Sequence, residues 1–135
     1  MKMCQVKKKK FGFPKRFRVL KTPEFKRCYK KGTRAKGKFF ILVLCNNSMN
    51  LTRLGLSISA KYGKAYKRNK FKRIIREAFR LIRPELEKGF DVIIVLPKTM
   101  KPEIPKLEEA KEEIKSLFQN AYKRLLKKNE IPKNN

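Results

Sequence analysis

The sequence predicts an α+β fold, an α-β-β-α-β-α sandwich with a small mixed sheet. Three short runs rich in Ile, Leu, Val and Phe read as strands, and three stretches with helical periodicity lie before, between and after them. A length of 135 residues suits one domain with a single modest core. We expect a disordered basic arm over residues 1–10, one domain over residues 11–128 and a tail over residues 129–135.

The first helix begins at Thr22-Pro23-Glu24, where a hydroxyl cap, a proline in the first turn and a carboxylate all favour a helix start. It is expected to run to about Lys31, with Gly32 as a left-handed stop.

Residues 38–45 and 52–59 read as two strands joined by turn residues 46–50, which predicts a hairpin. In the second strand, Leu54, Leu56 and Ile58 share one face. Gly55, Ser57 and Ser59 share the other face, which either leaves room for a ligand or lets a helix pack closely.

Lys64–Arg83 is a strongly basic helix that contains a single carboxylate, Glu77, and that Pro84 stops. Its two faces differ in kind. An apolar face contains Phe71, Ile74, Ile75, Ala78 and Ile82, and the opposite face contains Asn69, Arg73, Arg76 and Arg80, with Lys72 and Arg83 at its edge. A helix face that is merely solvated usually carries charges of both signs, whereas this face is almost entirely positive. Guanidinium groups bind phosphate oxygens well, so the face is predicted to bind phosphates.

The remaining elements complete the fold. Phe90–Leu96 reads as a buried strand, and Leu107–Lys127 as a long amphipathic helix with acids in its first turns.

Charge is distributed very unevenly along the chain, whose net charge is +27. Residues 1–83 hold 27 Lys or Arg against two acids, which predicts a polyanionic partner, and nucleic acid is the leading candidate. An anionic membrane surface is the weaker candidate, because no segment outside the globular fold pairs an apolar face with an isolated basic face. No apolar run is long enough to span a bilayer. Three widely spaced cysteines without any histidine favour reduced thiols in the cytoplasm.

The sequence offers binding chemistry without reaction chemistry. It contains no histidine, its one aspartate is Asp91 at the start of a strand, and Glu24 and Glu77 have structural explanations. An autonomous metal-dependent nuclease would need a carboxylate cluster or a His pair, so this reading is disfavoured.

The basic helix carries a recognisable motif. Arg68-Asn69-Lys70, followed by Arg73 and Arg76, resembles the signature of the bacterial ribonuclease P protein component, with Lys70 in place of an arginine. The resemblance extends through residues 55–65 and back to the first helix. It implies a left-handed β-α-β crossover around the basic helix, although such connections are right-handed in almost all proteins.

The resemblance also implies a function. In this family the RNA subunit is the catalyst and holds the Mg²⁺ ions, while the protein binds that RNA and the 5′ leader of precursor tRNA. Carried over by position, the RNA-subunit contacts would be Lys67, Arg68, Asn69, Lys70, Lys72, Arg73, Arg76 and Arg80. The leader cleft would contain Phe17, Phe25, Tyr29 and Val43, although aromatic residues on a short helix are as often core residues. The alternative reading is a structural RNA-binding protein, such as a ribosomal protein.

Overall fold

The computed structural model describes residues 17–19, 22–59, 63–97 and 103–128. Its elements are, in order, α2 (Thr22–Lys31), β1 (Thr33–Lys36), β2 (Ile41–Asn46), β3 (Arg53–Ile58), α3 (Ala65–Ile82), the 3₁₀ turn η3 (Arg83–Glu85), β4 (Phe90–Leu96) and α4 (Leu107–Lys128). The predicted arm over residues 1–10 and the tail over residues 129–135 lie outside the described residues. No helix in the described part of the chain is both long and apolar enough to cross a membrane.

The four strands form one mixed sheet in the order β1-β2-β4-β3. β2 is antiparallel to both β1 and β4, whereas β3 is parallel to β4. The predicted mixed sheet is therefore confirmed, but the predicted hairpin between the second and third strands is wrong. The chain does turn after β2, yet that turn is anchored to the entry of β4, where the Asn47 N–H donates to the Gly89 carbonyl at 2.9 Å. β4 thus occupies the place beside β2 that a hairpin would have given to β3.

The hairpin of this fold lies one element earlier, between β1 and β2. Residues 38–40, which were expected to begin a strand, belong to its turn, and the Gly37 N–H donates to the Phe40 carbonyl at 2.8 Å. β1 itself was not predicted, because its four residues include two exposed cations, Arg34 and Lys36, and only one buried side chain, Ala35.

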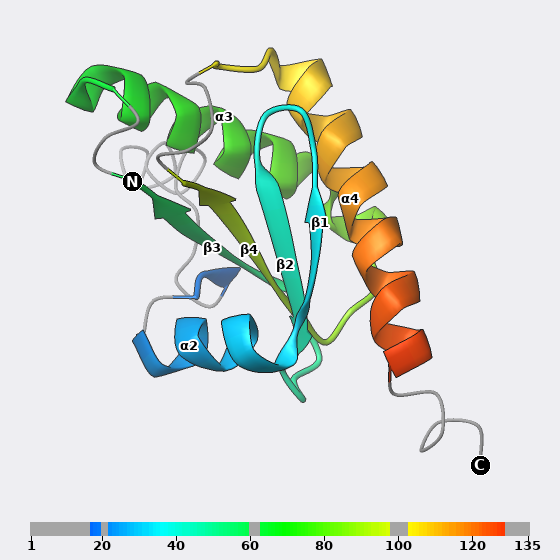
Figure 1. The fold of residues 1–135 in the computed structure, drawn as a ribbon. Coiled ribbons are helices and arrows are strands. Elements are labelled where there is room, and N and C mark those ends of the chain that lie inside the picture. Colours follow the sequence, from blue (N-terminus) through cyan, green and yellow to red (C-terminus); the bar gives the residue numbers. More distant parts are fainter. Residues whose placement is uncertain (1–16, 20–21, 60–62, 98–102, 129–135) are drawn as a thin grey trace, which may run out of the picture.

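Helices cover both faces of the sheet (Figure 1). α3 and α4 pack on one face, around a core that includes Phe40, Phe71, Phe79 and Phe118. α2 covers part of the other face, above a smaller cluster of Val19, Cys28, Val43, Cys45 and Ile93. In Figure 1, β3 and β4 both run upward, α3 passes behind the sheet and β4 lies to the right of β3, so the β3–α3–β4 crossover is left-handed, as the resemblance implied.

Gly32 ends α2 for a reason other than the expected one. Its φ is not among the positive values of the described residues, so it is not a left-handed stop. A Cβ atom at Gly32 would lie 2.4 Å from the Leu44 carbonyl oxygen and 2.6 Å from that of Cys28. The absence of a side chain therefore lets the end of α2 approach β2 closely.

Candidate RNA-binding surfaces

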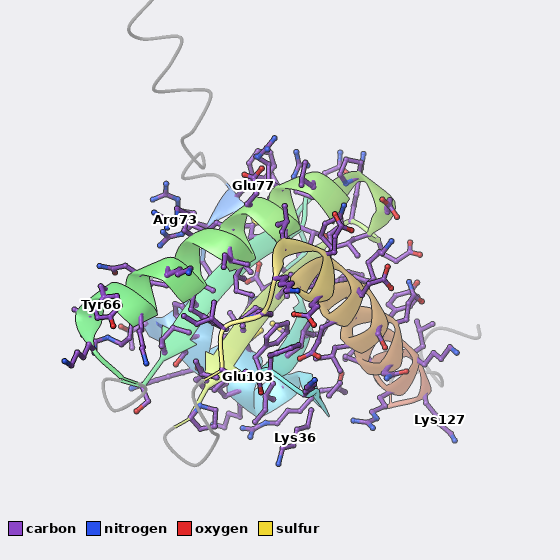
Figure 2. The ribbon with its side chains drawn as sticks, turned by 90° about the horizontal axis from the view of Figure 1, so that it is seen from above. Lys36, Tyr66, Arg73, Glu77, Glu103 and Lys127 are labelled. Atoms are coloured by element: carbon purple, nitrogen blue, oxygen red, sulfur yellow. The ribbon has the colours of Figure 1, made fainter. Side chains whose placement is uncertain are left out.

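The basic face of α3 is fixed by the burial of its opposite face. Phe71, Ile75, Ala78, Phe79 and Ile82 are buried against the sheet and α4, and Ile74 is half-buried. Phe79 is the one buried residue of this helix that the predicted apolar face did not include. The predicted polar residues Asn69, Arg73, Arg76 and Arg80 are all exposed, together with Lys67 and Lys70, while Arg68 and Lys72 are half-buried. Figure 2 shows Arg73 projecting from α3 on the side away from α4.

The cations on this face are not equivalent. Glu77 accepts two hydrogen bonds from Arg80, at 3.2 and 2.6 Å, so the charge of Arg80 is partly offset. Arg68 donates to the Gly63 carbonyl at 2.6 Å, so part of its hydrogen-bonding capacity is used just before the helix. Partial burial and the nearby Arg18 lower the pKa of the Arg76 guanidinium. Two cations held close together in this way favour an anion between them.

Tyr66 lies in the first turn of α3, at the same end as Arg68, and was not among the predicted site residues. Its side chain is 65% exposed (Figure 2), and lysines and arginines lie close to it in the sequence. An exposed aromatic ring among cations is a suitable platform for an unpaired base. The sequence could have indicated its exposure, because Tyr66 lies five residues before Phe71 and therefore on the polar side of the helix.

The second candidate surface lies on the face of the sheet that α2 partly covers. Phe25 and Tyr29 are both half-buried and pack against the cluster beneath α2, as the shared helical face predicted. Val43 is only 1% exposed, so it lies under α2 and offers no surface to a ligand. Gly55 lies under α2 as well: a Cβ atom there would meet Phe25 Cζ at 3.0 Å. At this position the close-packing explanation of the Gly/Ser face is correct.

The exposed part of this face lies one row of residues farther along the strands. Lys36 is paired with Ile41, Ile41 with Val95, and Val95 with Ser57, which together form a row across all four strands. Ile41, Val95 and Ser57 are half-buried and Lys36 is exposed. We call this row the sheet strip. Because residues two apart in a strand share a face, the sequence could have placed Ile41 on the same face as Val43. The position of Val95 beside Ile41 follows only from the order of the strands in the sheet.

Phe17 lies away from the other predicted cleft residues. Its ring packs against the core on the α3 side and lies 4.0 Å from the Arg83 guanidinium carbon. The next residues follow the outer edge of β3, where the Val19 N–H donates to the Leu54 carbonyl at 2.9 Å. The structure thus brings Phe25, Tyr29 and Val43 together and places Phe17 at the end of α3.

A buried polar network holds α2 on the sheet. The Asp91 carboxylate is fully buried and accepts two hydrogen bonds from Arg53, both at 2.8 Å, and one from Asn47 at 2.9 Å. Arg27 of α2 also reaches Asp91 at 3.4 Å, and Glu24 of α2 reaches Arg53 at 3.3 Å. Every oxygen of Asp91 is occupied, so its role is structural.

The described residues offer no site that fits a metal ion, since no three His, Cys, Asp or Glu side chains among them converge. A hydrogen bond to Cys45 and burial raise the pKa of the Cys28 thiol, so Cys28 is protonated and unsuited to act as a nucleophile. What this geometry supplies is cationic and aromatic binding surface.

The comparisons with known proteins decide the family. Residues 13–128 match the family model described as Ribonuclease P. The chain belongs to the ribonuclease P protein family.

Individual relatives agree with this assignment. A ribonuclease P protein component from Clostridium botulinum is 37% identical over 79 residues, which is 58% of this chain and 71% of the relative. One from Thermotoga petrophila is 31% identical over 97 residues, 72% of this chain and 83% of the relative.

Two solved ribonuclease P proteins share the fold. The protein from Thermotoga maritima aligns with a TM-score of 0.68 and 30% identity over 76% of this chain and 96% of its own. The one from Staphylococcus aureus aligns with a TM-score of 0.66 and 30% identity over 78% and 94%. The protein is thus a component of ribonuclease P, an endoribonuclease of tRNA processing, and the reading as a ribosomal protein is set aside.

Proposed function

We propose that this ribonuclease P protein binds the catalytic RNA subunit through the basic face of α3 and binds the 5′ leader of precursor tRNA on the α2 side of the sheet. The observation that carries the proposal is the exposed, nearly one-signed face of α3, which lies within the region matched by the family model. Phosphate oxygens are the ligands that such a row of guanidinium and ammonium groups prefers.

The leader would lie on the sheet strip, beside Phe25 and Tyr29. The half-buried side chains of Ile41 and Val95 offer apolar contact to bases, and Lys36 offers a charge to phosphate. A groove of this kind holds a single strand with little sequence readout.

Phosphodiester hydrolysis is assigned to the RNA subunit, which would hold the Mg²⁺ ions. The role of this chain is to bind and position the two RNAs in a cytoplasmic ribonucleoprotein, and no step of the chemistry is assigned to its side chains.

The test is reconstitution with a bacterial ribonuclease P RNA, followed by a precursor-tRNA cleavage assay at low Mg²⁺ concentration. The reconstituted complex should cleave at the 5′ end of the mature tRNA sequence far faster than either component alone. Cleavage by the protein without the RNA, or no effect of the protein on the RNA, would contradict the proposal. The role of the α3 face is tested with the Arg73→Ala, Arg76→Ala double variant. This variant should remain folded but lose most of the stimulation of RNA cleavage.

A further inference from the structure

A second group of exposed cations surrounds the free edge of the sheet, far from the basic face of α3. The group comes from the last turn of α2, from β1 and from the C-terminal half of α4, and we call it the β1-edge surface. Its members are Lys30, Arg34, Lys36, Lys123, Arg124 and Lys127, all of them exposed. Figure 2 shows Lys36 and Lys127 on the side of the molecule away from Tyr66 and Arg73.

The fold holds these three segments together at the edge. The Thr33 hydroxyl donates to the Ala121 carbonyl at 2.8 Å, which sets β1 against α4. The Arg124 guanidinium donates to the Arg34 carbonyl and so reaches around the outer side of β1. The cations of α4 and β1 therefore form one continuous surface.

The β1-edge surface carries charge of a single sign. No Asp or Glu occurs in the sequence between Glu24 and Glu77 or between Glu113 and Glu130. The acids of α4 all lie in its first turns, where Glu113 accepts hydrogen bonds from the N–H groups of Phe39 and Phe40 at 2.8 and 3.2 Å. Acids thus occupy the end of α4 beside the β1–β2 turn, and only cations occupy the other end. Such a surface is at its most stable with a polyanion bound.

This surface is continuous with the proposed leader site. Lys36 belongs to the sheet strip, and Arg34 is paired with Val43 in the next row of the same face. The Arg34 guanidinium carbon lies 6.0 Å from the centre of the Tyr29 ring. A strand that crosses the sheet strip toward β1 therefore meets Lys36 and Arg34 first, and then the cations of α4.

We propose that the β1-edge surface binds the phosphates of leader nucleotides that lie farther from the cleavage site than those on the sheet strip. This inference rests on the proposed function and extends it from a short leader segment to a longer one. The six side chains offer charge without aromatic rings, so the contacts are to phosphate and carry no sequence preference.

The test uses the reconstituted holoenzyme and three RNAs: mature tRNA and precursors with leaders of about four and about sixteen nucleotides, the range that small single-strand-binding domains cover. The variant is Lys123→Gln, Arg124→Gln, Lys127→Gln. Its matched control is Lys106→Gln, Lys111→Gln, Lys115→Gln, which removes the same charge from the acidic first half of α4 and from the residue just before it. Dissociation constants are measured over a series of salt concentrations.

The variant should weaken binding of the long-leader precursor on the order of tenfold at low salt and reduce its salt slope by about two, since each single-strand phosphate contact contributes about 0.7. Binding of the short-leader precursor, of mature tRNA and of the RNA subunit should not change, and the control should behave as wild type. Because Arg124 also bonds β1, the Lys123→Gln, Lys127→Gln variant should show about two thirds of the change in slope with the β1 contact intact.

Two results with the variant would overturn the inference, and one result with the wild type would overturn it together with the proposed leader site. If the triple variant has the same ratio of long-leader to short-leader affinity as the wild type, the β1-edge surface does not contact the leader. An equal loss for all three RNAs would assign the surface to the tRNA body or to the RNA subunit. If the wild-type holoenzyme itself shows no preference for precursor over mature tRNA, the proposed leader site fails first and the inference fails with it.

Discussion

Tyr29 is the residue that best tests the leader site, because it is only half-buried and its ring is within reach of Arg34. Tyr29→Ala should weaken binding of precursor tRNA by about 1–3 kcal/mol if a base stacks on the ring, and should leave binding of mature tRNA unchanged. The measurement is the ratio of the two dissociation constants for the reconstituted holoenzyme at one salt concentration. An unchanged ratio in a folded variant would identify Tyr29 as a core residue.

Asp91 is the centre of the buried polar network between α2 and the sheet. Asp91→Ala would leave the largely buried Arg53 without its bidentate partner, and breaking a buried pair in this way costs about 3–5 kcal/mol of unfolding free energy. Urea denaturation would measure it. Glu77→Ala breaks an exposed pair and should change stability by less than about 1 kcal/mol. Equal effects of the two substitutions would mean that the Asp91 network contributes nothing beyond a surface contact.

The roles of individual residues were only partly predictable from the sequence. The sides of α3 and the shared face of Phe25 and Tyr29 followed from helical periodicity, which depends only on the local sequence. The full burial of Val43 and the partial exposure of Ile41 did not follow from it, because they depend on where along the sheet α2 lies. That position is set by Asp91, Arg53 and Arg27, which come from three separate segments.

At the scale of elements, α3 separates stability from binding on its two sides. Phe71→Ala should lower the unfolding free energy by about 2–5 kcal/mol, because the ring is fully buried against Phe40 and the core. Arg76→Ala should leave stability unchanged or slightly raised, since it removes a cation close to Arg18, and should weaken binding of the RNA subunit. Thermal unfolding and RNA titration of both variants would measure this. The opposite pattern would mean that the helix is turned the other way.

Strand pairing was the part of the element-level prediction that was wrong. The turn residues after β2 indicate correctly that the chain reverses. They contain no information about β4, which comes later in the chain and lies between β2 and β3 in the sheet. β1 gave almost no signal, because an edge strand with two outward cations has neither an apolar run nor a clear alternation. The left-handed crossover was predicted by the family resemblance, since no local sequence pattern indicates the handedness of a connection.

At the scale of the whole molecule, the distribution of charge predicts how RNA binding depends on salt. If the basic face of α3 neutralises several phosphates, the logarithm of affinity for the RNA subunit should fall linearly with the logarithm of salt concentration, by about 0.7–0.9 per contact. Arg73→Ala should reduce this slope by about one contact. Arg80→Ala should reduce it less, because Glu77 already offsets its charge. An affinity that is nearly independent of salt would rule out an interface led by phosphate contacts.

The central position of β4 also governs the order in which the molecule can be assembled. β3 and α3 precede β4 in the chain, yet β3 joins the sheet through β4, so neither can reach its final place until residues 90–96 have been synthesised. Pairing of strands so distant in the sequence is slow compared with the closing of the β1–β2 hairpin. The nascent chain therefore carries its most basic segment for some time without a folded partner surface. A chain that stopped before Phe90 would retain every cation of α3 and would lack the strand that joins β3 to β2, so the sheet on which that helix packs would be incomplete.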